Sequence, residues 1–256
     1  MGAGDVRRCA RLLRSAAAAA FFAAAFSCAA VELQARSSDG RWLLRADNDA
    51  RALLAFDAGS GALVRRIAVA DKRGLTSRVA RIVDAPARRS FIALLADLPE
   101  AWELLYDPNA GPVFDGLVHD YRMGEGLASG GPLPVRRIVL DSPLADGLFS
   151  PDHRYFVARA GDGRVHVVSL DVRRVIERLR IDGDPAPERG LSWTAGGALC
   201  FAFPDRQAAR VHLLAAEGWR WEEPLGMSAP ARRLLWLADD RPAAELATGE
   251  TVRLPR

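Results

Sequence analysis

The fold is decided by a stretch in the second half of the chain, Ser150–Ile181, which reads SPDHRYFVARAGDGRVHVVSLDVRRVIERLRI. It contains two short apolar runs, RYFVARA and RVHVVSL, which are bounded by Gly, Pro and Asp. Short apolar or alternating runs between turn formers predict β-strands. The last part, Asp171–Ile181, fits either a helix or a turn followed by an outer strand, and we favour the strand.

The same unit, a polar turn that runs into an apolar strand, recurs along the chain. It is found in SSDGRW, APARRSF, SPDHRYF, TAGGALCF and APARRLLW, which end at Trp42, Phe91, Phe156, Phe201 and Trp236. A repeat of roughly 40–50 residues has the length of a propeller blade, as in YVTN- or WD40-like repeats. We therefore predict an all-β fold, a β-propeller of about five blades over residues 31–256, whose ring need not be complete. The alternative is an irregular β-sandwich.

The two ends of this region are expected to pair with each other. The last unit, LLWLADDRPAAELATGETVRLP, supplies only three plausible strands. An open sheet edge is an aggregation risk. We therefore expect the segment VELQAR, Val31–Arg36, to add a strand to the last blade.

Residues 1–30 have the features of a secretory signal peptide. Four arginines precede the Ala-rich apolar run SAAAAAFFAAAFSCAA, Ser15–Ala30, and small residues end it. The mature chain is then periplasmic, with no stable membrane span, whereas an uncleaved anchor or a lipoprotein is the alternative. Without this segment 31 of the 35 basic and 31 of the 32 acidic residues remain, so no basic surface predicts nucleic-acid binding.

Cysteine and aromatic residues limit the chemistry further. Cys9 and Cys28 lie in the leader, so Cys200 is alone in the mature chain and is expected in the core. No C-x-x-C-H motif for c-type haem and no zinc-type Cys/His cluster occurs. Trp219 and Trp221 are expected to pack between blades.

One long stretch between two strand-like runs, residues 106–134, is not itself strand-like. It reads YDPNAGPVFDGLVHDYRMGEGLASGGPLP and is rich in Gly and Pro at both ends. Loops of this length in ordered domains usually carry function. We expect it to fold over one mouth of the propeller as a binding surface. Its polar centre contains Asp115, His119, Asp120, Tyr121, Arg122 and Glu125.

Three motifs resemble the propeller domain that carries d1-type haem in cytochrome cd1 nitrite reductases, and related d1-domain-like periplasmic propellers. They are DGLVHDYRMGEG (Asp115–Gly126), PDHRYFV (Pro151–Val157) and VVSLDVRR (Val167–Arg174). The resemblance implies an eight-bladed propeller with a modified haem in its centre, and nitrite chemistry in denitrification or a role in making or handling d1 haem. This chain is long enough for only about five such blades.

The resemblance also shows where this chain departs from the family. The two distal-pocket histidines of the nitrite reductases fall on Ala145 and Ala186. Arg189 and, less closely, Arg78 match family arginines that would pair with haem carboxylates. With both histidines absent, a non-catalytic protein that binds a tetrapyrrole or a periplasmic protein partner is favoured over the alternative, a d1-haem-dependent redox or haem-modifying enzyme.

The predicted cofactor-binding residues are therefore His119, Arg122, Arg189 and Arg78, with d1-type haem as the candidate cofactor. His119 can serve as an iron ligand or proton donor, or can simply hydrogen-bond the loop to the propeller. In a competing interpretation Asp115, Arg122 and Glu125 form an ion-pair lock. The other histidines have simpler predicted roles: His153 lies in a surface turn, and His166 and His212 lie on strands.

Overall fold

The computed structural model describes residues 33–111, 113 and 131–254. The chain forms two compact units, an N-terminal unit of residues 28–146 and 170–175 and a C-terminal unit that includes residues 147–169 and 176–256. Both consist of short strands and turns; the described residues also contain the 3-10 helices η2 (Pro86–Arg88) and η4 (Pro187–Arg189). The all-β prediction is confirmed.

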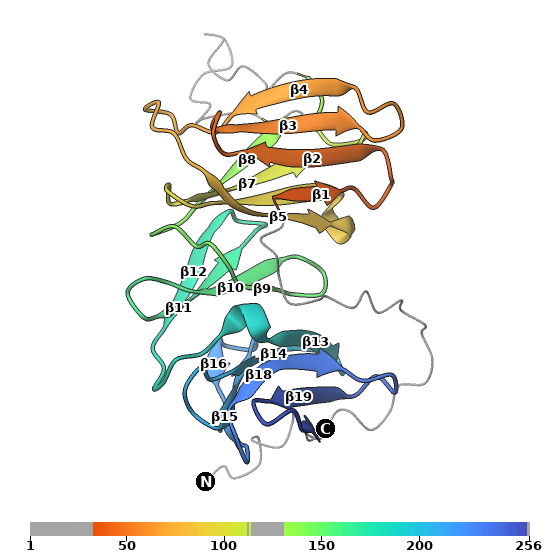
Figure 1. Cartoon of the computed structure of the whole chain (residues 1–256). Helices are drawn as coiled ribbons and strands as arrows, with labels where there is room; N and C mark the ends of the chain where they lie inside the picture. The colour runs from red at the N-terminus through yellow and green to blue at the C-terminus, as the bar shows by residue number, and fades with distance from the viewer. Residues whose placement is uncertain (1–32, 112, 114–130, 255–256) are drawn as a thin grey trace. The chain divides into compact units, whose positions relative to one another are not determined.

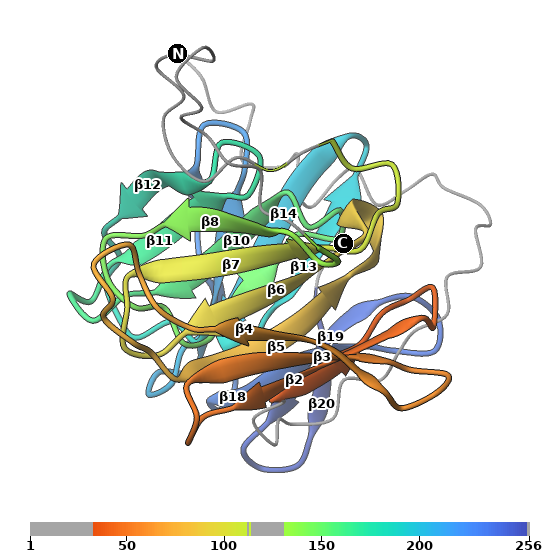
Figure 2. The ribbon, with the colours of Figure 1, turned by 90° about the horizontal axis from the view of Figure 1, so that it is seen from above.

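The N-terminal unit contains two antiparallel four-stranded meanders (Figure 1). The first consists of β1 (Gln34–Arg36), β2 (Trp42–Asp47), β3 (Ala52–Asp57) and β4 (Leu63–Ala68). The second consists of β5 (Val79–Ala85), β6 (Ser90–Leu95), β7 (Glu100–Leu105) and β8 (Val135–Val139). Figure 2 shows these last four strands side by side in chain order.

The C-terminal unit repeats the pattern. Its first meander is formed by β9 (Leu148–Phe149), β10 (Tyr155–Arg159), β11 (Val165–Ser169) and β12 (Arg174–Leu179). The first two residues of β12 belong to the N-terminal unit, where Arg174 pairs with Val139 of β8 in parallel. The next contains β13 (Leu191–Ala195), β14 (Ala198–Pro204), β15 (Arg210–Ala215), β16 (Arg220–Trp221) and β17 (Leu225–Gly226). The last contains β18 (Ala231–Trp236), β19 (Pro242–Leu246) and β20 (Thr251–Arg253). The described residues thus form five successive meanders, and β12 confirms that Asp171–Ile181 contains a strand rather than a helix.

The sequence repeat reflects a shared turn. In SSDGRW the Ser37 hydroxyl donates to Asp39 Oδ1 at 2.6 Å and accepts from the Trp42 N–H at 2.8 Å. In SPDHRY, Ser150 makes the same two contacts, at 2.7 Å to Asp152 and 3.0 Å from the Tyr155 N–H.

The fourth residue of this turn has a left-handed backbone in both copies. It is Gly40 in the first, with φ 74°, and His153 in the second, with φ 54°. Because a side chain is disfavoured in this conformation, glycine is the usual residue there. The prediction that His153 lies in a turn is confirmed.

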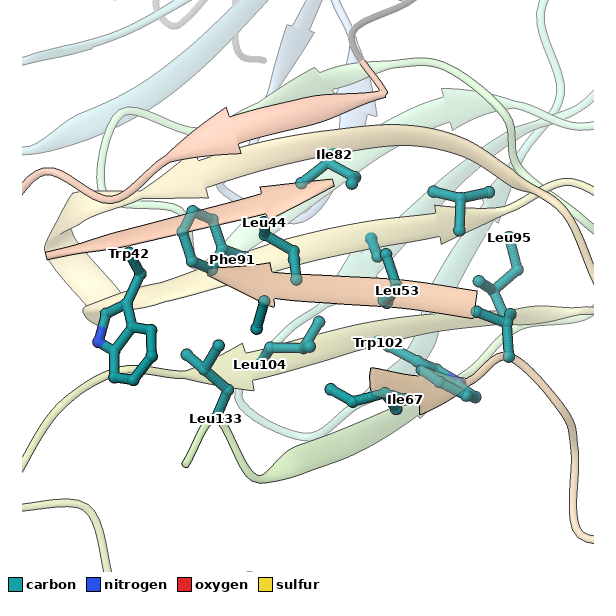
Figure 3. Close-up of a cluster of buried hydrophobic side chains, with 14 of the residues drawn as sticks. Trp42, Leu44, Leu53, Ile67, Ile82, Phe91, Leu95, Trp102, Leu104 and Leu133 are labelled. Carbon is teal, nitrogen blue, oxygen red and sulfur yellow. The ribbon is translucent and has the colours of Figure 1, made fainter. Parts of the chain in front are cut away.

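The core of the N-terminal unit lies between its two meanders. Figure 3 shows Trp42, Leu44 and Leu53 of the first meander packed with side chains of the second, which include Phe91 and Trp102. Leu44, Leu53 and Phe91 are fully buried. Burying a large apolar side chain contributes roughly 1.5–3 kcal/mol, so the contact between meanders is the main apolar contribution to this unit.

The C-terminal unit has equivalent cores between successive meanders. Phe201 and Phe203 of β14 pack with Val157 and Val167 of the preceding meander. On the other side, Ala202 of β14 packs with residues of β18 and β19. Cys200 is buried as expected.

The two tryptophans pack as the sequence predicts. The Trp219 ring lies 5.0 Å from that of Tyr155 on β10, between two meanders. Trp221 lies 6.1 Å from the ring of Phe203 and packs against the cluster that contains Val157 and Val167 of the preceding meander. The meander β13–β17 contacts a neighbouring meander on each of its two faces, as a propeller blade does and as a sheet of a two-layer sandwich does not.

The expectation for the N-terminal strand is wrong. Gln34–Arg36 pairs with β2 of the first meander, in the register Gln34↔Arg45 and Arg36↔Leu43, and not with the last one. The Ser37–Gly40 turn closes this hairpin locally. Closing a short loop costs less conformational entropy than bringing distant segments together. The last meander keeps three strands among the described residues.

Candidate functional site

The candidate site begins where the long stretch 106–134 leaves the second meander. Asp115, His119, Asp120, Tyr121, Arg122 and Glu125 all lie outside the described residues. Both ends of the stretch are described. They converge because Leu104 of β7 faces Val135 of β8, and the Leu105 N–H donates to the Pro134 carbonyl at 3.1 Å.

The first end is held by Tyr106, which is 6% exposed. Its hydroxyl donates to Asp84 Oδ1 at 2.7 Å and lies 3.0 Å from Ser38 Oγ. Burial raises the pKa of Tyr106 to about 12 and also raises the pKa of the Asp84 carboxyl above its ordinary value. This end is therefore joined to both meanders of the N-terminal unit.

The second end is held by Arg65 of β4. Its Nη1 donates to the carbonyl oxygens of Pro132, at 2.5 Å, and Leu133, at 3.2 Å. Burial lowers the pKa of the Arg65 guanidinium from its ordinary value. Leu133 is 2% exposed and has a left-handed backbone with φ 56°, which a leucine adopts only where its surroundings enforce it. This end is therefore held by a guanidinium that binds two backbone carbonyls.

Arg78, a predicted haem-carboxylate partner, is already paired. Its Nε and Nη2 donate to the two oxygens of Asp97 at 3.1 and 2.6 Å. Arg51 also contacts Asp97, at 3.3 Å. A bidentate fork of this kind satisfies the directional hydrogen bonds that a haem carboxylate would need. Ligand binding by Arg78 would therefore compete with a contact inside the N-terminal unit.

Arg189 lies in η4 of the C-terminal unit and is more accessible. Its side chain is 47% exposed, and its Nε lies 3.5 Å from Glu188. Glu188 itself is held by a shorter pair with Arg206, at 2.6 Å. Arg189 therefore keeps most of its donors for another partner, and of the two predicted arginines it is the one whose geometry suits a ligand carboxylate.

Ala145 and Ala186, which stand where the nitrite reductases have their distal histidines, differ in solvent exposure. Ala186 is fully buried, and its N–H donates to the Pro204 carbonyl at 2.9 Å. Ala145 is exposed and belongs to the N-terminal unit. It is followed closely by Gly147, where an added Cβ would lie 2.5 Å from the Val157 carbonyl oxygen. At Gly147, therefore, the surroundings leave no room for a side chain.

The described histidines are engaged in structure. His212 is 4% exposed, and its Nε2 lies 2.9 Å from Asp205 Oδ2. His166 is 2% exposed on β11, and His153 packs against Phe149. Within residues 33–111, 113 and 131–254, no group of three or more His, Cys, Asp or Glu side chains could hold a metal ion. Among these residues, Arg189 keeps donors for a ligand carboxylate.

Sequence reasoning missed a buried ion pair in the N-terminal unit. Glu103 is 1% exposed, accepts from Arg88 Nε at 2.8 Å and lies 3.1 Å from Ser90 Oγ. Arg88 also donates to Asp171 at 2.6 Å, and its pKa is raised because these carboxylates outweigh the effect of burial. The signal in the sequence was the charge inside the apolar run AWELLY, since a buried carboxylate requires a partner.

The described part of the chain contains no helix that is long and apolar enough to cross a membrane. No protein-family model matches the sequence. Among curated proteins, the chain is 30% identical over 185 residues to a dihydro-heme d1 dehydrogenase of Pseudomonas aeruginosa. The match covers 72% of this chain and 33% of that protein, so the chain spans about a third of the relative's length.

A solved structure gives the same relationship. The chain resembles the dihydro-heme d1 dehydrogenase NirN in complex with DHE, with a TM-score of 0.70 and 25% identity. The match covers 87% of this chain and 45% of that one. The predicted propeller fold is therefore confirmed.

Proposed function

Because this chain belongs to the d1-haem-domain-like β-propellers, we propose that it is a periplasmic binding or accessory protein. It would bind a tetrapyrrole or a protein partner through the stretch 106–134 without catalysing a reaction. The signal peptide over residues 1–30 would deliver it, and residues 31–256 would form the propeller.

The observation that carries this proposal is the anchoring of the two ends of the stretch. Ser38 and Arg65 of the first meander bind Tyr106 and the Pro132–Leu133 segment, respectively. Loops anchored at a rigid β scaffold are where binding residues concentrate. Arg122 and Arg189 would pair with ligand carboxylates, since an arginine fork suits a carboxylate.

His119 would approach the iron or hydrogen-bond the ligand, with Asp115, Asp120, Tyr121 and Glu125 forming the rest of the loop surface. A d1-type haem, when bound, would supply a redox-active tetrapyrrole. The positions of the two distal histidines hold Ala145 and Ala186, which have no proton to donate. This supports binding rather than catalysis.

The second candidate function is a haem-modifying or redox enzyme. It is favoured by the curated relative, which is named as a dehydrogenase of dihydro-heme d1. The two functions differ in outcome: a binding protein returns the tetrapyrrole unchanged, and an enzyme changes its absorption spectrum with time. The chain should therefore be purified from a host that makes d1 haem, and its absorption spectrum should be recorded over time.

The site itself is tested with His119→Ala and Arg122→Ala, measured for haem or partner binding and for thermal unfolding. We expect binding to fall while the melting temperature stays within a few degrees. His153→Gly is the matched control, because glycine fits the left-handed backbone of that turn. If both variants bind normally and only melt earlier, the loop is a structural ion-pair lock and the proposal fails.

A further inference from the structure

The face of the first meander that points away from its core has an unusual composition. Arg36, Leu43 and Phe56 are directly opposite one another on β1, β2 and β3. Residues opposite each other in adjacent strands share one face of a sheet. Their neighbours Ala35, Leu44 and Ala55 belong to the core cluster or pack against it, so the Arg36–Leu43–Phe56 row lies on the other face.

Arg45 lies on this face one row further along β2, opposite Gln34 and Leu54. Its guanidinium carbon lies 5.1 Å from the centroid of the Phe56 ring. Arg36 is oriented by a hydrogen bond from Nη2 to the Gly40 carbonyl at 3.2 Å. Each of the two guanidinium groups is therefore oriented by a contact with an uncharged group.

Other arginines of the same unit have carboxylate partners. They are Arg78 with Asp97, Arg81 with Asp146, Arg88 with Glu103, and Arg137 with Glu100. Arg36 and Arg45 have no ion pair with a carboxylate among the residues that the structure describes. Two unpaired guanidinium groups beside apolar side chains attract an anion.

These residues line a depression of about 310 Å³. That volume lies near the lower end of the roughly 300–1,000 Å³ found for small-molecule sites. Asp57 also lines it, at the end away from Arg45. The Asp57 carboxylate is turned into its own loop, where Oδ1 accepts from the Ser60 N–H and hydroxyl, both at 2.8 Å. The Asp57 carboxylate is therefore already engaged within its own loop.

We propose that this depression binds a small organic anion with a flat apolar body, of the aromatic carboxylate or sulfonate class. The anionic group pairs with Arg36 and Arg45, and the apolar body lies on Leu43 and Phe56. The site uses only residues of β1–β3 and the turn after β3, and is independent of the stretch 106–134 and of the function proposed for it.

The test compares two fluorescent probes that share an aromatic body, 8-anilinonaphthalene-1-sulfonate and the uncharged N-phenyl-1-naphthylamine. We expect saturable binding of the sulfonate at one site per chain and much weaker binding of the neutral probe. Arg36→Gln and Arg45→Gln should each weaken sulfonate binding by about tenfold, as loss of one charge-assisted contact predicts. Arg73→Gln, an exposed arginine in the turn after β4, is the matched control and should bind like the wild type.

Thermal unfolding of each variant checks that the fold is intact, since the sulfonate probe also binds loosened proteins. The proposal is overturned if the double variant Arg36→Gln/Arg45→Gln binds the sulfonate as the wild type does. It is also overturned if the neutral probe binds equally well, or if the sulfonate shows no saturable binding to the wild type.

Discussion

Tyr106 donates its phenolic hydroxyl to Asp84 across 2.7 Å, and so joins the start of the long stretch to β5. Tyr106 is buried and Asp84 is half-buried, and burial raises the pKa of the Asp84 carboxyl. Ser38 of the first meander completes the cluster at 3.0 Å from the Tyr106 oxygen. This contact explains why the stretch leaves the sheet at a fixed point although its sequence has no strand pattern.

We expect Tyr106→Phe to lower the free energy of unfolding by about 1–2 kcal/mol, because the half-buried Asp84 carboxyl loses its donor. Urea denaturation measures the change. Tyr155→Phe is the control, since its ring packs on Trp219 and no hydrogen bond of its hydroxyl occurs in the described structure. Equal stability of wild type and Tyr106→Phe would show that this hydrogen bond does not anchor the stretch.

Replacing one partner should lower the free energy of unfolding far more in the buried pair of Arg88 and Glu103 than in the surface pair of Arg78 and Asp97. Arg88→Met leaves Glu103 buried without its main partner, and we expect a loss of about 3–5 kcal/mol. Asp97→Asn should cost about 1 kcal/mol or less, because that pair is exposed. The double variant Arg88→Met/Glu103→Leu should recover part of the loss, as seen by chemical denaturation. If the double variant is no more stable than Arg88→Met, the unpaired charge of Glu103 is not the cause of the lost stability.

Asp205 should make the free energy of unfolding depend on pH in the acidic range. Burial alone would raise its pKa, but the N–H groups of Ala208 and Gln207 and the His212 ring together hold the pKa well below its ordinary value. A carboxyl whose pKa is lower in the folded state stabilises the fold above the unfolded pKa, near 4. That contribution is lost as the pH falls through the folded pKa.

Asp205→Asn should therefore be about 2–4 kcal/mol less stable than the wild type at pH 7, with the gap narrowing below about pH 4. Urea denaturation at a series of pH values measures the gap. A difference that stays constant from pH 7 to pH 3 would contradict the role of the carboxylate charge.

Gly147→Ala should destabilise the C-terminal unit by about 1–3 kcal/mol, the usual cost of overpacking. An added Cβ would lie 2.5 Å from the Val157 carbonyl oxygen and 2.6 Å from the Phe156 ring. Gly111→Ala is the control, because a Cβ there would meet no atom within 4 Å. The melting temperatures of the two variants give the comparison, and equal values would show that β10 shifts freely to make room.

The purified protein should not turn over nitrite with an artificial reductant. In the nitrite reductases that the sequence resembles, distal histidines serve as the proton donors, and general acid catalysis of this kind contributes about 10²–10⁴-fold. Ala145 and Ala186 occupy those positions. Nitrite consumption that is abolished by a substitution within this chain would contradict this expectation.

The sequence by itself determined the elements and their repeat. Ser37–Asp39 and Ser150–Asp152 form the same hydrogen-bonded turn, and Gly40 and His153 share its left-handed position. These contacts join residues that are close in the chain, so composition and spacing are sufficient to predict them. The loop site around His119 and Arg122 stays a prediction, because those residues lie outside the described structure.

Only the tertiary structure decided which distant groups meet. It pairs Arg78 with Asp97 and places Arg65 on the carbonyls of Pro132 and Leu133. It also pairs Gln34–Arg36 with β2, where the sequence had suggested the last blade. The alternation of apolar and polar residues in a strand predicts which residues face a core, but it does not predict with which other strand that strand pairs. The partner is selected by the balance of hydrogen bonding and burial against the conformational entropy of closing each loop.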